Sequence, residues 1–398
     1  MEPHEFEQRY YTQRKGTSCY KWDILKSKYG SEDMISMWVA DMDFRVAEPI
    51  LDAIHCRVDH GVFGYTMPPE GYFDAFCKWE EKRHNVKVPK EWICFAPGVV
   101  PAIYWCVSAF SEKGDSIMIN TPVYYPFREA VNDLGRKLVR NELVNTNGYY
   151  TFDYDDMERK LRDENVKIYI LCSPHNPVGR VWKVEELERV LNLCHKYGVL
   201  VLADEIHQDF VYPGHVHTST LCDRYQQYWD NLIMMTAASK SFNLAGLKNS
   251  FVMIPSDERR AIYMDFVKSV QVDTGCIFGY TAIEAAYRTG ESWLDDVSKV
   301  IRANFEYARD LFQTELPNSV VTDLEGTYLM WVNLQAYLPD EDVKEVVQTR
   351  AKVAVDYGEW FSDRCGGFIR LNLATSRKMV ESAVKSIIYQ VKNYKKGV

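Results

Sequence analysis

A strand, a helix and a second strand follow one another between residues 167 and 204. The first strand is predicted at Lys167–Cys172, and Lys183–Tyr197 has apolar residues at helical spacing, with Gly198 placed to cap its end. The apolar run Val199–Asp204 follows directly. Strands joined through a helix run parallel, and strands that are apolar throughout are covered on both faces. This unit therefore predicts an α/β fold built on a mainly parallel sheet.

The same alternation extends over residues 90–255 and then changes. Further strands are predicted there at Ser116–Ile119, Leu232–Thr236 and Ser250–Ile254. From about residue 281 longer helical segments appear, followed by strand-like runs at 326–332 and 368–373. A chain of 398 residues is long enough for two domains. We therefore predict a large domain at 46–280 and a smaller α+β domain formed by 1–45 with 281–398.

Charge and composition exclude several classes of protein. The net charge of -9, from 47 basic and 56 acidic residues, argues against nucleic acid as a partner. No segment approaches the roughly 20 apolar residues that span a bilayer, and the acidic start Met1–Glu7 does not resemble a signal peptide. The 10 cysteines are widely spaced and include no Cys-x-x-Cys pair. We expect free thiols and a cytoplasmic location.

Three polar side chains lie at the ends of predicted strands or in the turns after them. Asn176 follows the strand that ends at Cys172, Asp204 ends the next one, and Lys240 comes shortly after Leu232–Thr236. An amine, a carboxylate and an amide are the groups that pyridoxal 5'-phosphate requires. The amine binds the aldehyde, the carboxylate keeps the ring nitrogen protonated, and the amide donates to the phenolic oxygen. Taken alone, Asp204 is more often a helix N-cap.

A phosphate site is predicted where Gly98 opens a helix. The free amides of Val99 and Val100 can point at an anion, and the hydroxyl of Ser239 can complete the site. Many helices that begin with glycine bind nothing, so this motif is weak by itself. Lys248 could add a cation, but an exposed lysine without a ligand is an equal alternative.

Two tyrosines and one arginine are candidates for the substrate side. In the run Thr121–Phe127 we expect Tyr124 to stack on the cofactor ring and Tyr125 to handle a proton, although core tyrosines in a proline-bounded loop are an even alternative. Arg370 lies in an apolar strand, where a guanidinium needs a carboxylate partner. That partner is either the α-carboxylate of an amino acid substrate or an internal Asp or Glu.

Four histidines fall in one stretch without the pattern of a metal site. The pair His215 and His217 has no third ligand at useful spacing, so no metal is expected. His175 flanks Asn176, and His207 follows Asp204 by three positions. Either can support the cofactor, and we assign His207 to the cofactor site.

Together these runs resemble the fold-type I, aspartate-aminotransferase-like enzymes, and more closely the cystathionine β-lyase/cystalysin group of C–S lyases. The resemblance spans most of the chain in the family's order. It rests on the following runs: Trp38–Phe44, Phe63–Thr66, Thr121–Phe127, Ser173–Trp182, Asp204–His207, Ser239–Gly246 and Arg370–Ala374. His207 stands where aminotransferases of the wider superfamily place a tyrosine, and Thr375–Arg377 replaces a more usual proline-containing tail.

The resemblance implies a homodimer in which Tyr65 of one subunit reaches the cofactor phosphate of the other. It implies that Lys240, Asp204, Asn176 and Arg370 take the roles given above. The expected reaction is β-elimination from cystathionine or a related cysteine S-conjugate, as in a cysteine desulfhydrase, to pyruvate, ammonia and a thiol. Methionine biosynthesis is the expected context.

Two other functions stay open at this point. A class-I/II aminotransferase would share the steps up to removal of the α-proton. A regulatory protein that keeps the fold without the chemistry is a rival, although a binding module needs no catalytic amine.

Overall fold

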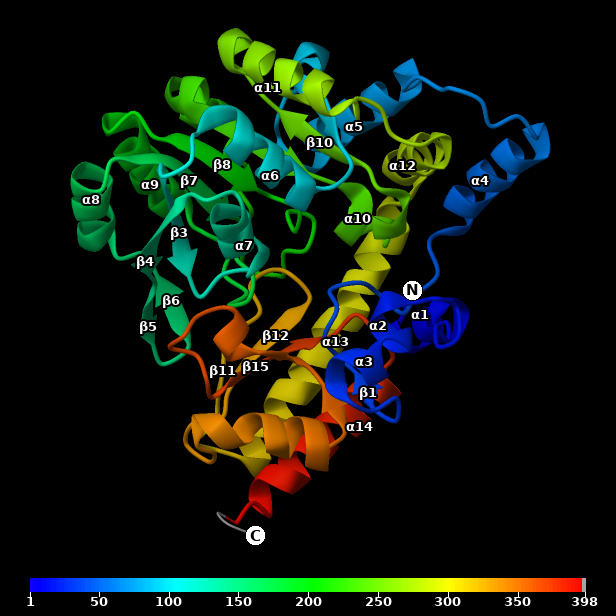
Figure 1. The fold of residues 1–398 in the computed structure, drawn as a ribbon. Helices are drawn as coiled ribbons and strands as arrows, with labels where there is room; N and C mark the ends of the chain where they lie inside the picture. The colour runs from blue at the N-terminus through cyan, green and yellow to red at the C-terminus, as the bar shows by residue number, and fades with distance from the viewer. Residues whose placement is uncertain (396–398) are drawn as a thin grey trace.

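The computed structural model describes residues 1–395, and a seven-stranded sheet forms its larger half (Figure 1). The strand order is β2-β10-β9-β8-β7-β3-β4. The strands, in chain order, are β2 (Ile93–Ala96), β3 (Ser116–Thr121), β4 (Lys137–Glu142), β7 (Val166–Cys172), β8 (Leu200–Asp204), β9 (Leu232–Thr236) and β10 (Ser250–Met253). Only β10 runs antiparallel to its neighbours, β2 and β9. The prediction of a mainly parallel α/β sheet is therefore confirmed.

Helices cover both faces of this sheet, which explains why its strands are apolar throughout. One face packs against α6 (Val99–Phe110) and α7 (Pro126–Asp133), with α11 (Asp257–Val270) against α6. The other face carries α8 (Tyr154–Asp163) and α9 (Val184–Lys196). Alternate residues of β7 enter different cores, with Ile168 and Ile170 in one and Tyr169 and Leu171 in the other.

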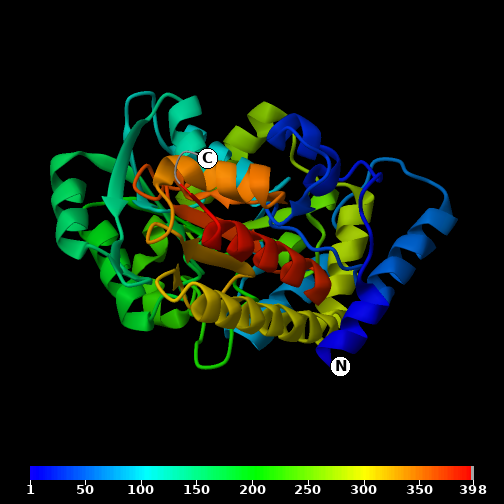
Figure 2. The same ribbon diagram turned by 90° about the horizontal axis from the view of Figure 1, so that it is seen from below.

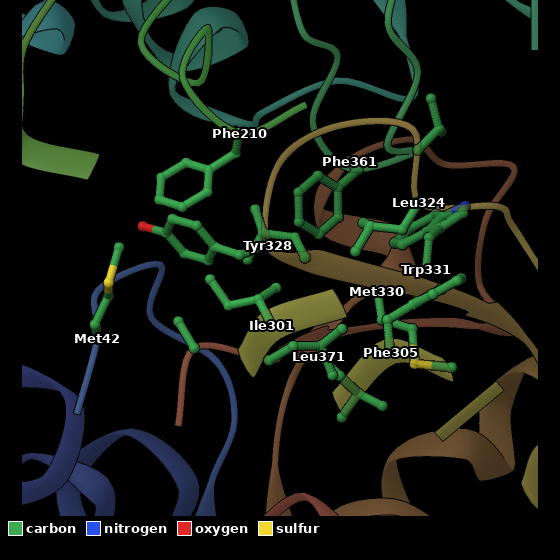
Figure 3. Packing of buried hydrophobic residues seen from close by; sticks show 14 of the residues in the cluster. Met42, Phe210, Ile301, Phe305, Leu324, Tyr328, Met330, Trp331, Phe361 and Leu371 are labelled. Carbon is green, nitrogen blue, oxygen red and sulfur yellow. The ribbon is translucent and has the colours of Figure 1, made fainter. Parts of the chain in front are cut away.

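A smaller antiparallel sheet lies on the side of the C-terminus, in the order β11-β12-β15-β14. Its strands are β11 (Val320–Val321), β12 (Leu329–Asn333), β14 (Asp356–Tyr357) and β15 (Phe368–Asn372). The helices α13 (Glu291–Glu315) and α14 (Arg377–Lys392) pack side by side near it (Figure 2). Ile301 and Phe305 from α13 meet Met330, Trp331 and Leu371 in a buried apolar core (Figure 3).

The remaining elements complete the chain. They are α1 (Pro3–Tyr10), α2 (Tyr20–Asp23), α3 (Leu25–Tyr29), α4 (Glu48–His60), α5 (Glu70–His84), α10 (Ala238–Ser241), α12 (Ile277–Thr289), the hairpin β5 (Val144–Thr146) with β6 (Tyr149–Thr151), and β1 (Ile35–Ser36) paired with β13 (Val353–Ala354). Turns of 3-10 or π helix lie at Lys90–Trp92, Asp223–Asn231, Ala245–Leu247, Asp340–Asp342, Glu345–Arg350 and Gly358–Trp360. Among residues 1–395, no helix has the length and apolar character needed to cross a membrane.

The predicted elements agree closely with the observed ones, whereas the domain boundaries stay a prediction. The strand predicted at 232–236 coincides with β9, and the helix predicted at 183–197 differs from α9 by one residue at each end. Gly198, just after α9, has a positive φ of 67°, which glycine adopts without strain. The predicted boundary at residue 280 falls inside α12, and this helix packs against α4 and α5.

Candidate active site

A cavity of about 280 Å³ lies at the carboxyl ends of the parallel strands. Its lining comes from the ends of β7 and β8, from the loops after β3, β7, β8 and β9, from the start of α6 and from an N-terminal segment. The lining residues are Ala40, Pro97, Gly98, Val99, Val100, Pro101, Tyr124, Cys172, Asn176, Asp204, Ile206, His207, Ser239, Lys240, Ala245 and Lys248. Loops at this edge of an open α/β sheet form its usual ligand site, because consecutive strand ends converge there.

Lys240 lies on α10, a helix of 4 residues that begins directly after β9. Its Nζ donates a hydrogen bond to the backbone carbonyl of Ala40, at 2.6 Å. Burial lowers the pKa of Lys240 to about 8, because an ammonium ion loses its hydration in the cavity wall. Because this pKa lies near neutral pH, the amine can both release and gain a proton there.

Asp204 ends β8, and one of its oxygens, Oδ1, accepts the amide of Ile206 at 3.1 Å. Within the described chain it forms no ion pair, and burial raises the pKa of this carboxyl to about 7. A turn follows Asp204 instead of an α-helix, so the helix N-cap interpretation is wrong. A buried carboxylate that forms no ion pair and faces a cavity is suited to a ligand that brings a positively charged N–H group.

Arg370 is buried beside the cavity and already has partners. Its guanidinium donates to the side-chain oxygen of Asn176 at 2.9 Å and to the carbonyl of Trp38 at 3.1 Å. It also forms an ion pair with Asp356, which is its register neighbour on β14, and the side chains of both ion-pair partners are 2% exposed. The internal acidic partner considered from the sequence is therefore present. Since the oxygen of Asn176 is taken, its NH₂ group is left for another acceptor.

The start of α6 faces the cavity, as the sequence predicts. Val99 and Val100 are the first residues of the helix, so their amides have no partner within it. Ser239 and Lys248 line the same cavity. Two backbone donors, a hydroxyl and a lysine therefore belong to the lining of one cavity, and this set of groups suits a phosphate.

The two adjacent tyrosines occupy different places. Tyr124 lines the cavity, and burial raises its pKa to about 12, so its phenol stays protonated. Tyr125 does not line the cavity. Its ring packs against Trp360 and Phe361, with centroids 6.1 and 5.8 Å away. The assignment of a proton-handling role to Tyr125 stays a prediction.

The histidines are also separated by the fold. His207 lines the cavity with its Nδ1 buried and unpaired, and burial lowers its pKa well below the ordinary value. His175 is buried against the carbonyl of Pro122 at 2.8 Å, and His217 pairs with Glu205 at 3.0 Å. Over the part of the chain that the structure describes, no group of three metal-ligating side chains is arranged around a common point.

Tyr65 is fully exposed and does not line the cavity of its own chain. It lies in the extended segment 61–69 between α4 and α5, at the edge of the molecule in Figure 1. Val62, Phe63 and Met67 of the same segment are also exposed. The assignment of Tyr65 to a partner's cofactor site stays a prediction.

The segment Trp38–Phe44 contributes to the site mainly through its backbone, which sequence patterns do not reveal. The carbonyl of Ala40 accepts hydrogen bonds from Lys240 and, at 2.8 Å, from the hydroxyl of Tyr328. Asn372 donates to the carbonyls of Val39 and Asp41. Cys172 and Ile206 also line the cavity, and neither is predicted from the sequence: Cys172 ends the strand before Asn176, and Ile206 directly precedes His207.

Comparisons with known proteins agree with this geometry. Residues 61–387 match the family model for aminotransferase class I and II. Cystathionine beta-lyase PatB of Bacillus subtilis is 39% identical over 378 residues, which cover 94% of this chain and 97% of that protein. Protein MalY of Escherichia coli is 29% identical over 387 residues, covering 95% of this chain and 97% of that protein.

Solved structures give the same result. Cystalysin from Treponema denticola, which contains pyridoxal 5'-phosphate, has a TM-score of 0.93 at 34% identity, covering 97% of this chain and 98% of that one. The PLP-bound C–S lyase from Staphylococcus hominis has a TM-score of 0.90 at 31% identity, covering 96% and 97%. The chain belongs to the aminotransferase class I and II family.

Proposed function

We propose that the chain is a pyridoxal-phosphate-dependent C–S β-lyase, which cleaves cystathionine or related cysteine S-conjugates to pyruvate, ammonia and a thiol. The observation that carries this proposal is one cavity that holds a buried lysine with a lowered pKa and, near it, a buried carboxylate that forms no ion pair within the described residues. The relatives that are named as cystathionine β-lyases and C–S lyases support the choice of reaction.

The residues around the cavity fit the cofactor. Lys240 would hold its aldehyde, Asp204 its ring nitrogen, and the free NH₂ of Asn176 its phenolic oxygen. Val99, Val100 and Ser239 would hold the phosphate, with Lys248 as an additional cation, and Tyr124 would lie against the ring. When bound, the cofactor supplies an electron sink for the bond that breaks at the substrate α-carbon.

The chain's own groups would then orient the substrate and move protons. Arg370 is the residue that we assign to the α-carboxylate, which would bind in addition to, or in place of, its present partners. The amine of Lys240 is suited to removing the α-proton, because its lowered pKa leaves a substantial unprotonated fraction near neutral pH. Lys240 or Tyr125 would protonate the departing thiolate, and His207 would support the cofactor.

A homodimer is part of this proposal. An exposed apolar segment at 61–69 suits burial against a second subunit, and Tyr65 would then reach the partner's phosphate. Hybrids of Lys240→Ala and Tyr65→Phe subunits test the arrangement. If Tyr65 acts across the interface, each hybrid has one site with both changes and one with neither, so activity rises to about half of the wild-type value. If Tyr65 acts within its own chain, no site in the hybrid is intact.

We also infer a reducing compartment, such as the cytoplasm, because the structure leaves all ten cysteines as free thiols, including the exposed Cys56 and Cys276. Release of homocysteine from cystathionine would make methionine biosynthesis the metabolic context.

The decisive experiment is incubation of the purified protein with cystathionine or cysteine in the absence of any keto acid. Pyruvate, ammonia and thiol or sulfide should appear together in equal amounts. A strict requirement for a keto-acid acceptor would instead assign the chain as an aminotransferase. Absence of both reactions, together with absence of a visible absorbance band, would indicate a regulatory protein.

A further inference from the structure

The turn after β8 has two sides with different environments. Asp204, Ile206 and His207 face the cavity. Glu205 and Asp209 belong to the same turn but have their partners elsewhere, and Gln208 donates to Glu80 of α5 at 2.7 Å. The turn therefore presents one set of side chains to the active site and anchors itself through the other.

Asp209 makes the widest set of these contacts. Its Oδ1 accepts hydrogen bonds from the indole N–H of Trp79 at 3.1 Å and from Nε2 of His84 at 3.0 Å, both on α5. Its Oδ2 accepts the hydroxyl of Ser241. Ser241 is the last residue of α10 and follows Lys240 directly. One buried carboxylate thus joins the turn that carries Asp204, the helix that carries Lys240, and the scaffold helix α5.

The ionisation of His84 and Asp209 strengthens the hydrogen bond between them. Burial lowers the pKa of His84, but the carboxylates of Glu80 and Asp209 outweigh burial, so the net direction is upward. Burial raises the pKa of Asp209, but the hydrogen bonds and charge of His84, with the hydroxyl of Ser241, hold it below its ordinary value. An ionised carboxylate accepts stronger hydrogen bonds than a neutral group does.

We propose that Asp209 is a positioning residue for Lys240, acting through the hydroxyl of Ser241. The inference rests on the proposed function, because it assumes that Lys240 holds the cofactor and transfers the proton. A helix of 4 residues has little rigidity of its own, so its direction depends on contacts from outside. The bond from Ser241 to Asp209 fixes α10 relative to the turn that begins with Asp204. The distance and angle between the amine and the carboxylate are set by this connection.

Two variants separate positioning from general support of the fold. Ser241→Ala removes the hydrogen bond between α10 and Asp209. Trp79→Phe removes a different hydrogen bond to Asp209, which comes from α5 and not from α10. Both leave His84 paired with Asp209, and both should lower the melting temperature. Ser241→Thr retains the hydroxyl and serves as the conservative rescue.

We expect loss of the hydrogen bond from α10 to change catalysis, and loss of the hydrogen bond from α5 to leave it unchanged. Ser241→Ala should lower kcat about tenfold with little change in KM, because a reacting group is displaced while substrate binding is kept. It should also move the midpoint pH of the cofactor's visible absorbance and weaken cofactor binding severalfold, measured by titration without substrate. Trp79→Phe should leave these three values close to wild type, and Ser241→Thr should restore most of them.

Equal effects of Ser241→Ala and Trp79→Phe, or unchanged kcat and absorbance in Ser241→Ala, would overturn the proposal. Failure of the proposed function would be recognised separately, because the wild-type protein itself would then release no pyruvate. If Ser241→Ala does not fold, Ser241→Cys replaces it, because a thiol occupies the same position but donates a weaker hydrogen bond to Asp209. A lowered kcat and a shifted absorbance midpoint in Ser241→Cys but not in Trp79→Phe support positioning, and values equal to those of Trp79→Phe contradict it.

Discussion

The two sides of the active site differ in how their polar groups are paired. On the sheet side, the carboxylate of Asp204 and the first amides of α6 face the cavity, and within residues 1–395 Asp204 forms no ion pair, although the charge of Lys240 acts on it. On the arginine side, Arg370 is bound by Asp356, Asn176 and the carbonyl of Trp38. The sheet side is thus prepared for a ligand that supplies the missing charges. The arginine side is stable without a ligand, so a substrate carboxylate must share or replace an existing partner.

The largest expected effect concerns Lys240 on the sheet side. Lys240→Ala should abolish pyruvate release while the protein stays folded, because the amine is the only group here assigned to both cofactor attachment and proton removal. Borohydride reduction and peptide mapping of the wild type should place the tagged lysine at position 240. A tag on any other residue, or substantial turnover by the variant, would remove the assignment.

Asp204→Asn tests the unpaired carboxylate of the same side. At an effective dielectric constant near 20 and about 3 Å separation, the attraction between a carboxylate and a protonated ring nitrogen is on the order of 5 kcal/mol. Loss of this attraction should lower kcat by roughly several thousandfold, while the cofactor content measured by absorbance falls much less. A variant that keeps a tenth of the wild-type kcat would show that Asp204 does not carry this role.

Arg370→Lys tests the arginine side. A lysine cannot serve Asn176, Asp356 and Trp38 together, because it lacks the planar, forked set of donors. The KM for an amino acid substrate should rise about 10- to 100-fold, with a smaller change in kcat. The matched control is Arg140→Lys, since Arg140 is exposed and its guanidinium forms a surface ion pair with Asp363. Equal kinetics for the two variants would argue against a carboxylate site at Arg370.

The smallest effect on activity is expected in the buried layer behind the sheet side, where a change alters stability instead of turnover. Burial raises the pKa of Glu80 to about 7, so the folded protein binds its proton more tightly than the unfolded chain does. The stabilisation is present in full below about pH 4.5 and is lost as the pH rises towards 7, a change of about 3 kcal/mol. Glu80→Gln should remove this part of the pH dependence. The measurement is the melting temperature of the wild type and of Glu80→Gln at pH 5 and pH 8. An equal change in melting temperature between the two pH values for both proteins would contradict the prediction.

The same contrast explains how much the sequence could predict. The sheet side can be predicted residue by residue, because Asn176 and Lys240 follow strands, and Asp204 ends a strand, that are each recognisable from the local sequence. Parallel pairing then brings their strand ends together without further information. The fold class followed from the same local patterns.

The arginine side depends on contacts between distant segments. Asp356 meets Arg370 only through the register of β14 and β15, and no local pattern sets that register. The carbonyl of Ala40 is a backbone group, so no residue type marks it. Tyr124 and Tyr125 are adjacent and chemically alike, and only the packing of Trp360 and Phe361 separates their surroundings.

The hydrogen bond from Arg370 to Asn176 is where the two sides meet. Thermodynamic linkage makes any coupling through it reciprocal. If binding of a substrate carboxylate to Arg370 raises the affinity of the site for the cofactor, the bound cofactor must raise the affinity for that carboxylate by the same factor. The substrate affinity of the protein therefore depends on whether the cofactor is bound.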